Sequence, residues 1–121
     1  MAEELTFRFA KEADAGTILS FIKALAEYEK LADQVVATEE LLREWIFQKG
    51  KAEVLFAVKD GREIGFALFV HNVSTFLGRA GLYLEDLFIL PEYRGRGYGS
   101  TMLQYVEDRF RDKAVRLRLE V

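Results

Sequence analysis

Apolar residues recur along this chain with two different spacings, and these spacings predict its secondary structure. Short runs rich in apolar, β-branched and aromatic residues predict strands at 5–9, 54–59, 63–72 and 82–90, and an alternating run predicts another at 114–121. Helical spacing predicts helices at about 14–31, at about 38–47, and behind a glycine-rich turn at 95–99. The order β-α-α-β-β-β-α-β predicts a mixed α/β sheet with flanking helices.

Capping and turn residues mark where these elements begin, end or reverse. Asp14 and Thr38 are the predicted N-caps of the first two helices. The Asp-Gly pair at 60–61 predicts a tight hairpin between two strands. Pro91 cannot donate a ladder hydrogen bond, so the strand before it should end there. The segment 73–81 is predicted to be an irregular turn.

The glycine-rich turn joins the fourth predicted strand to the third predicted helix. In this turn Gly95, Gly97 and Gly99 alternate with Arg96 and Tyr98. A single glycine would indicate only a positive φ angle. Three alternating glycines flanked by arginines favour a site where unpaired backbone N–H groups, at the positive end of a helix dipole, bind an anion. Phosphate is the commonest occupant of such a site, so the turn predicts phosphate binding.

Two well-known phosphate loops match this turn poorly. A P-loop carries Lys followed by Ser or Thr after its last glycine, whereas Tyr98, Gly99 and Ser100 stand here. A Rossmann turn needs G-x-G-x-x-G, and here the third glycine comes one residue early. Glu120 ends the next predicted strand, where a ribose-binding acid would lie. A dinucleotide-binding fragment therefore stays open as an alternative.

Composition narrows the class of protein. The 121 residues are enough for one domain, and half of them are hydrophobic with charges of both signs, which is typical of a globular domain. The net charge of −3 gives no reason to expect nucleic acid. There is no cysteine, and His71 is the only histidine, so no metal site is predicted. The sequence has neither a secretory signal nor an apolar run of about 18 residues, so a cytoplasmic protein without a membrane partner is expected.

The motif R-x-x-G-x-G, realised by Arg94, Gly97 and Gly99, resembles the acetyl-coenzyme A (acetyl-CoA) binding motif of the GNAT N-acetyltransferase superfamily. The longer string YLEDLFILPEYRGRGYGS resembles the diamine (spermidine/spermine) acetyltransferase branch and its bacterial relatives. The resemblance implies a mostly antiparallel central sheet, acetyl-CoA as co-substrate, and a cofactor pyrophosphate held by backbone N–H groups. The implied cofactor-binding residues are Leu87, Phe88, Ile89, Arg94, Gly95, Arg96, Gly97, Tyr98, Gly99 and Ser100.

An adjacent pair of acids, Glu85 and Asp86, interrupts the apolar strand before the turn and supplies candidate catalytic residues. A protonated amine has a pKa of about 10.4, so its attack on a thioester needs a base. Glu85 is the principal candidate, acting through a water, and Asp86 would attract a cationic substrate. Strand alternation sends the two to opposite faces unless a bulge re-aims one. The alternative is that one of them is a structural fixture, paired with an arginine or a backbone N–H. The resemblance places the oxyanion-stabilising backbone N–H among residues 87–89.

Residues that would contact the amine are less clearly marked. Glu27 and Tyr28 close the first helix, where a solvated face is the default, but the resembled family places this helix end beside the amine site. The polyamine enzymes carry an acid and a tryptophan before the central strand, whereas Ser74, Thr75 and Phe76 stand here. This departure weakens a specific polyamine assignment, so the expected acceptor is a primary amine of a small molecule, either polyamine-like or an amino-acid side chain.

Members of the resembled family continue beyond the position of Val121 through another helix and further strands, one of which supplies a tyrosine that protonates the leaving thiolate. We therefore expect a single domain at 1–121 that is C-terminally incomplete, whose last strand would leave an exposed edge and favour a homodimer. A coenzyme A binding module, or a catalytically incomplete fragment, is the main alternative to an active acetyltransferase.

Overall fold

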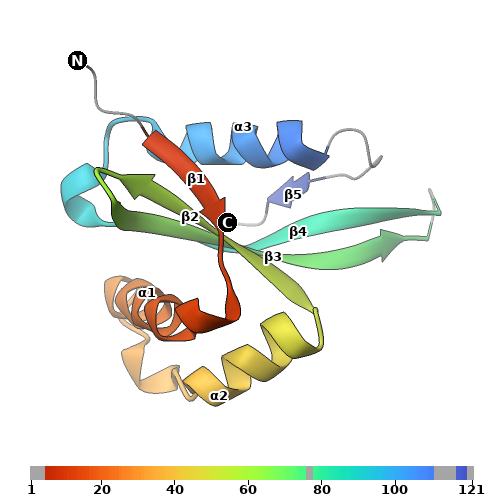
Figure 1. Ribbon diagram of the computed structural model, residues 1–121, viewed down its shortest axis with the longest axis horizontal. Coiled ribbons are helices and arrows are strands. Elements are labelled where there is room, and N and C mark those ends of the chain that lie inside the picture. Colours follow the sequence, from red (N-terminus) through yellow and green to blue (C-terminus); the bar gives the residue numbers. More distant parts are fainter. Residues whose placement is uncertain (1–4, 76–77, 111–116, 120–121) are drawn as a thin grey trace.

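The computed structural model describes residues 5–75, 78–110 and 117–119, and its centre is one sheet of five strands in the order β1-β2-β3-β4-β5 (Figure 1). Strands β1 to β4 pair antiparallel with one another, and β5 runs parallel to β4. The predicted mixed, mostly antiparallel sheet is confirmed. Of the strand expected at 114–121, residues 117–119 form β5 and the others lie outside the described residues. The strands are β1 Leu5–Phe9, β2 Ala52–Lys59, β3 Arg62–Ser74, β4 Arg79–Ile89 and β5 Leu117–Leu119.

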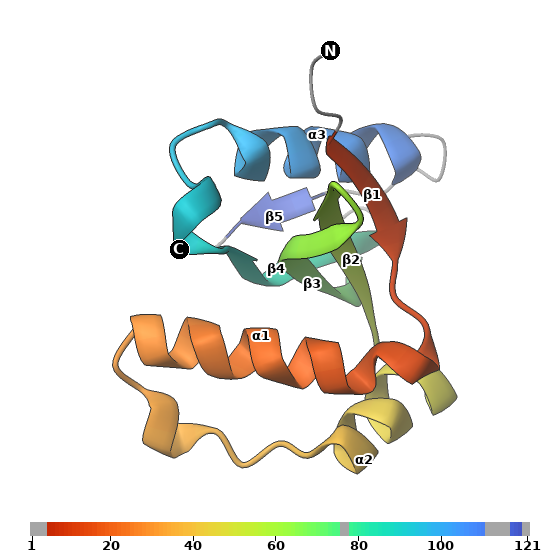
Figure 2. The same ribbon diagram turned by 60° about the vertical axis from the view of Figure 1, so that its left-hand side comes forward.

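Helices cover both faces of the sheet. Helices α1 and α2 lie on one face and α3 lies on the other (Figure 2). The longer helices are α1 Ala15–Tyr28 and α3 Tyr98–Phe110, and the short α2 Glu39–Leu42 continues as a π-helical segment, η3 Arg43–Gln48. Single turns complete the chain: η1 Glu12–Asp14, η2 Ala32–Gln34 and η4 Pro91–Tyr93.

The sheet divides the hydrophobic core into two clusters because successive side chains of a strand point to opposite faces. In β2, Leu55 packs with the cluster around Met102 and Val106 of α3, whereas Phe56 packs with the cluster around Phe21 of α1. Burial on both faces explains why β2 and β3 read as nearly continuous apolar runs rather than as alternating ones.

The local sequence predicts the β2–β3 hairpin well and the β3–β4 hairpin poorly. Asp60 and Gly61 both have positive φ, 53° and 76°, and join β2 to β3 in the predicted two-residue turn. The irregular turn predicted at 73–81 is wrong in extent, because the β3–β4 ladder runs out to the pair Ser74 and Arg79. Val73 in this extension is exposed, so the ladder continues beyond the buried core. Phe76 lies outside the described residues.

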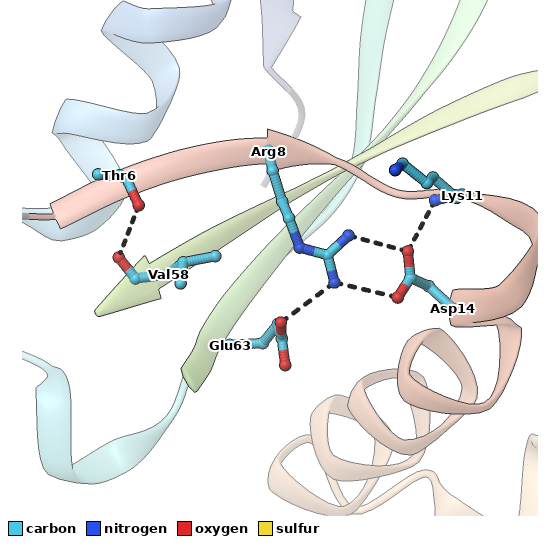
Figure 3. Close-up of polar contacts among 6 residues, drawn as sticks. All are labelled: Thr6, Arg8, Lys11, Asp14, Val58 and Glu63. Carbon is cyan, nitrogen blue, oxygen red and sulfur yellow. Dashed lines mark hydrogen bonds and ion pairs between the residues drawn. The ribbon is translucent and has the colours of Figure 1, made fainter. Parts of the chain in front are cut away.

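An ion-pair network fixes the start of α1 against the sheet (Figure 3). The Arg8 guanidinium donates to both carboxylate oxygens of Asp14, at 2.9 and 3.0 Å, and to Glu63 at 3.1 Å. Arg8 and the Lys11 amide together lower the pKa of Asp14. Asp14 therefore occupies the predicted N-cap position without capping the helix amides, since a bidentate charged partner is the stronger one. The cap predicted at Thr38 is confirmed by its bond from the Leu41 amide at 3.1 Å.

Gly65 of β3 lies against Phe88 and Ile89 of β4, where there is no room for a side chain. A Cβ at this position would lie 2.5 Å from Ile89 Cδ1 and 2.7 Å from the Phe88 carbonyl oxygen. We expect Gly65→Ala to lower the free energy of unfolding by about 1–3 kcal/mol, measured by urea denaturation, because backbone cannot yield as a flexible side chain does. The matched control is Gly16→Ala in α1, where a Cβ meets only the Glu39 carboxylate at 3.3 Å. An equal loss in both variants would contradict this explanation.

Candidate active site

A cavity of about 430 Å³ opens between the end of α1, the second half of β4 and the glycine turn. Its wall therefore combines elements from both faces of the sheet. The lining residues are Leu25, Tyr28, Glu29, Leu87, Phe88, Ile89, Tyr93, Arg94, Gly95, Gly97, Tyr98, Gly99 and Ser100. Nine of the ten predicted cofactor-binding residues thus lie around one cavity. The tenth, Arg96, is exposed, and its guanidinium carbon lies 5.6 Å from the centre of the Tyr93 ring.

The glycine turn presents its backbone to open space. Gly95 and Gly97 have φ of 78° and 77°, and apart from adjacent residues of the chain no atom lies within 4 Å of where a Cβ would stand on either. Helix α3 begins at Tyr98, and the Thr101 amide donates to the Gly97 carbonyl at 3.0 Å. The amides before this first helical bond have no partner within the helix, and the helix dipole adds positive potential there. The geometry fits an anion such as a diphosphate.

A β-bulge places the acid pair. Leu68 pairs with Asp86 and Phe69 pairs with Leu84, so Glu85 has no partner in β3. Directly opposed residues point to the same face, so Asp86 shares the α1 face with Leu68, which packs in the α1 cluster. Asp86 is half-buried and Glu85 is exposed. Bulges often re-aim side chains next to active sites.

The predicted catalytic pair, Glu85 and Asp86, does not line the cavity, but the charge of Glu29, which does, acts on Asp86. Burial, with smaller contributions from the negative charges of Glu85 and Glu29, raises the pKa of Asp86 from 3.8 to about 6. This favours Asp86 over Glu85 as the group whose ionisation is tuned toward neutral pH. No described arginine or lysine bonds Asp86, and its pKa is raised rather than lowered. The described contacts of Asp86 therefore give no support to the alternative in which it is a structural residue paired with an arginine.

The end of α1 contributes a residue that the sequence analysis missed. Tyr28 and Glu29 line the cavity, whereas Glu27 is exposed and is not part of the lining. Leu25 also lines it, so these three residues have the i, i+3, i+4 spacing of one helix face. That spacing could have selected Glu29 over Glu27.

Other predicted features lie away from the cavity. The His71 imidazole lies 2.7 Å from a Glu53 carboxylate oxygen on neighbouring strands, with both side chains partly exposed. The described residues contain no group of three or more His, Cys, Asp or Glu that could hold a metal ion. None of the described helices has the length and apolar character to span a membrane. Glu120, on which the dinucleotide alternative depends, lies outside the described residues.

Comparison with known proteins decides the family. The family model described as Acetyltransferase (GNAT) family matches residues 16–121. Thialysine N-ε-acetyltransferase of Bos taurus is 43% identical over 124 residues, which cover 94% of this chain and 72% of the bovine protein. The chain belongs to the acetyltransferase (GNAT) family. The resemblance drawn from the glycine turn is confirmed.

Two further comparisons agree with this assignment. Spermidine/spermine N(1)-acetyltransferase-like protein 1 of Homo sapiens is 32% identical over 105 residues, covering 80% of this GNAT chain and 15% of the human protein. A crystal structure of a predicted acetyltransferase with acetyl-CoA from Clostridium acetobutylicum superposes with a TM-score of 0.80, covering 98% of this chain and 81% of that one. At 17% identity, the likeness to that structure concerns the fold.

The raised pKa of Asp86 predicts how stability depends on pH in this GNAT domain. Because the folded pKa of about 6 exceeds the ordinary 3.8, folding favours the protonated carboxyl, and stability is lost as pH rises through this interval. We therefore expect Asp86→Asn to raise the melting temperature above pH 6, with a smaller gain or none below pH 3.8. Thermal denaturation followed by circular dichroism measures this. Glu107→Gln, an exposed carboxylate on α3, is the control, and a gain independent of pH would contradict the prediction.

Proposed function

We propose that the chain binds acetyl-CoA in the cavity and transfers the acetyl group to a primary amine of a small cationic molecule, polyamine-like or an amino-acid side chain. One observation carries the proposal: a single cavity runs from the open glycine turn to the end of α1, where Glu29 lines it and where the charge of Glu29 acts on the nearby Asp86. The names of the relatives, thialysine and spermidine/spermine acetyltransferases, agree with a small amine as acceptor.

The cofactor's diphosphate would lie against the amides from Gly95 to Ser100, where the backbone is uncovered. From there the cavity leads along residues 87–89, whose main chain is the proposed source of the N–H that stabilises an oxyanion. Among the described residues, β5 pairs only with 82–84 of β4, so this part of β4 has no described neighbour on its second edge. Its main chain is available to a ligand there.

Bound acetyl-CoA would supply an acetyl group activated as a thioester. The residues of the chain have to prepare the amine, whose pKa of about 10.4 keeps it protonated at neutral pH. Asp86, with a pKa of about 6, is mostly ionised at pH 7 and takes up a proton more readily than an ordinary aspartate. Glu85 remains the second candidate for the base, and either acid can act through a water.

Negative charge is also the proposed basis of acceptor choice. Glu29 and Glu85 raise the pKa of Asp86, so the site gains free energy when a cation neutralises this group of carboxylates. Tyr28 adds an aromatic surface beside Glu29 in the lining. An acceptor with a second positive charge is therefore preferred to one with a single amine. The homodimer and the cytoplasmic location stay predictions.

The first test measures thiol release from acetyl-CoA with thialysine, spermidine, 1,3-diaminopropane and propylamine as acceptors. We expect the three acceptors with more than one amine to react with higher kcat/KM than propylamine, and kcat/KM to rise with pH through about 6 as Asp86 ionises. Asp86→Asn should lower kcat/KM by about 10²-fold or more, and Glu85→Gln should lower it less. Glu107→Gln serves as the control. Cofactor binding without release of thiol for any amine would favour a coenzyme A binding module instead.

The second test concerns the glycine turn. Gly97→Val introduces a branched side chain at a left-handed φ, where the proposed diphosphate approaches the backbone. We expect its Kd for acetyl-CoA, measured by calorimetry, to rise about tenfold or more, because charge-assisted amide contacts are lost. Gly50→Val is the matched control, since Gly50 has φ of 61° and equally open surroundings but lies away from this cavity. Equal affinity in the two variants would remove the turn from the binding site.

A further inference from the structure

Arg94 connects three elements at the edge of the cavity. Its Nε donates to the Ile89 carbonyl at 2.7 Å, which anchors the side chain to the end of β4. Its guanidinium carbon lies 4.3 Å from the centre of the Tyr28 ring and 4.9 Å from the centre of the Phe88 ring. The two rings meet edge-on, with centroids 6.5 Å apart. A cation from the glycine turn is therefore held by aromatic side chains of α1 and β4.

The position of Tyr28 is not explained by core packing. It is the last residue of α1, and 65% of its surface is exposed, so its ring contributes little to the buried clusters. Its ring contacts in the described part of the chain are with Arg94 and Phe88. An exposed aromatic ring that stacks on an arginine beside a cavity suggests a role in placing that arginine.

Arg94 keeps most of its hydrogen-bonding capacity for a ligand. A guanidinium carries five N–H donors, of which Nε–H is used by Ile89. The described residues accept no hydrogen bond from its terminal nitrogens, and Arg94 lines the cavity beside the open glycine turn. One backbone acceptor and a stacked ring fix the plane of the guanidinium, which lowers the entropy lost when an anion binds.

We propose that Tyr28 is a positioning residue for Arg94, holding its guanidinium ready for the diphosphate of the cofactor. This inference rests on the proposed function, because it needs the anion at the turn to be part of acetyl-CoA. The same contact links the end of α1 to the cofactor. An anion that holds Arg94 in place also holds Tyr28, which is adjacent to Glu29 in the proposed acceptor region. Cofactor and acceptor then bind with positive coupling, which is reciprocal by linkage.

A double-mutant cycle on the full chain tests the proposal, with the Kd for acetyl-CoA measured by calorimetry. We expect Tyr28→Ala to raise Kd by about threefold to tenfold, the size of a partly desolvated cation–π contact. Tyr28→Phe keeps the ring and should bind like the unaltered chain. In an Arg94→Ala background, Tyr28→Ala should change Kd by less than about twofold, since the partner is gone. The melting temperature should stay unchanged in Tyr28→Ala, because the ring is exposed.

Kinetics separate positioning from a structural effect. Tyr28→Ala should raise the KM for acetyl-CoA while kcat changes little, and Tyr28→Phe should restore KM. An unchanged Kd in Tyr28→Ala, additive effects of the two alanine substitutions, or a Phe variant as weak as the Ala variant would each overturn the inference. If the unaltered chain does not bind acetyl-CoA, the proposed function itself fails. If it binds and Tyr28 has no effect, this inference alone fails.

Discussion

The amides at the start of α3 must face open space while the helix behind them is packed against the sheet, and the geometry of the site depends on this constraint. Met102 and Val106 are fully buried against the sheet and fix the helix. Gly95 and Gly97 turn the chain with positive φ and leave the surface in front of the amides free of side chains. An amphipathic helix with a bare N-terminus thus meets the cavity with its positive end.

Strand β4 has to place two carboxylates within a mostly apolar sheet. The bulge at Glu85 solves this by leaving one acid exposed and the other half-buried beside the end of α1. The cost shows in the raised pKa of Asp86, which reflects burial and two neighbouring negative charges. Such a cost is typical of functional sites, where electrostatic strain serves chemistry rather than stability.

The site therefore has two chemically different ends joined by one strand. The proposed anion-binding end is made from local backbone geometry, and the proposed cation-attracting end is made from side chains of α1 and β4 that are far apart in sequence. Arg94 lies between the two ends. It donates to the Ile89 carbonyl at the end of β4 and stacks on the Tyr28 ring at the end of α1. In the proposed function, this arrangement holds a thioester and an amine side by side.

The sequence by itself determined the order of strands and helices, the hairpin at 60–61, the cap at Thr38 and the glycine turn, because these follow from local side-chain spacing and backbone preference. Only the tertiary structure decided the features that need distant partners. Asp14 binds Arg8 instead of capping the helix amides, and the register of β4 against β3 places the bulge at Glu85. The packing of α1 brought its end against β4 and the glycine turn to form the cavity, because contacts between such distant segments are not encoded in spacing along the chain.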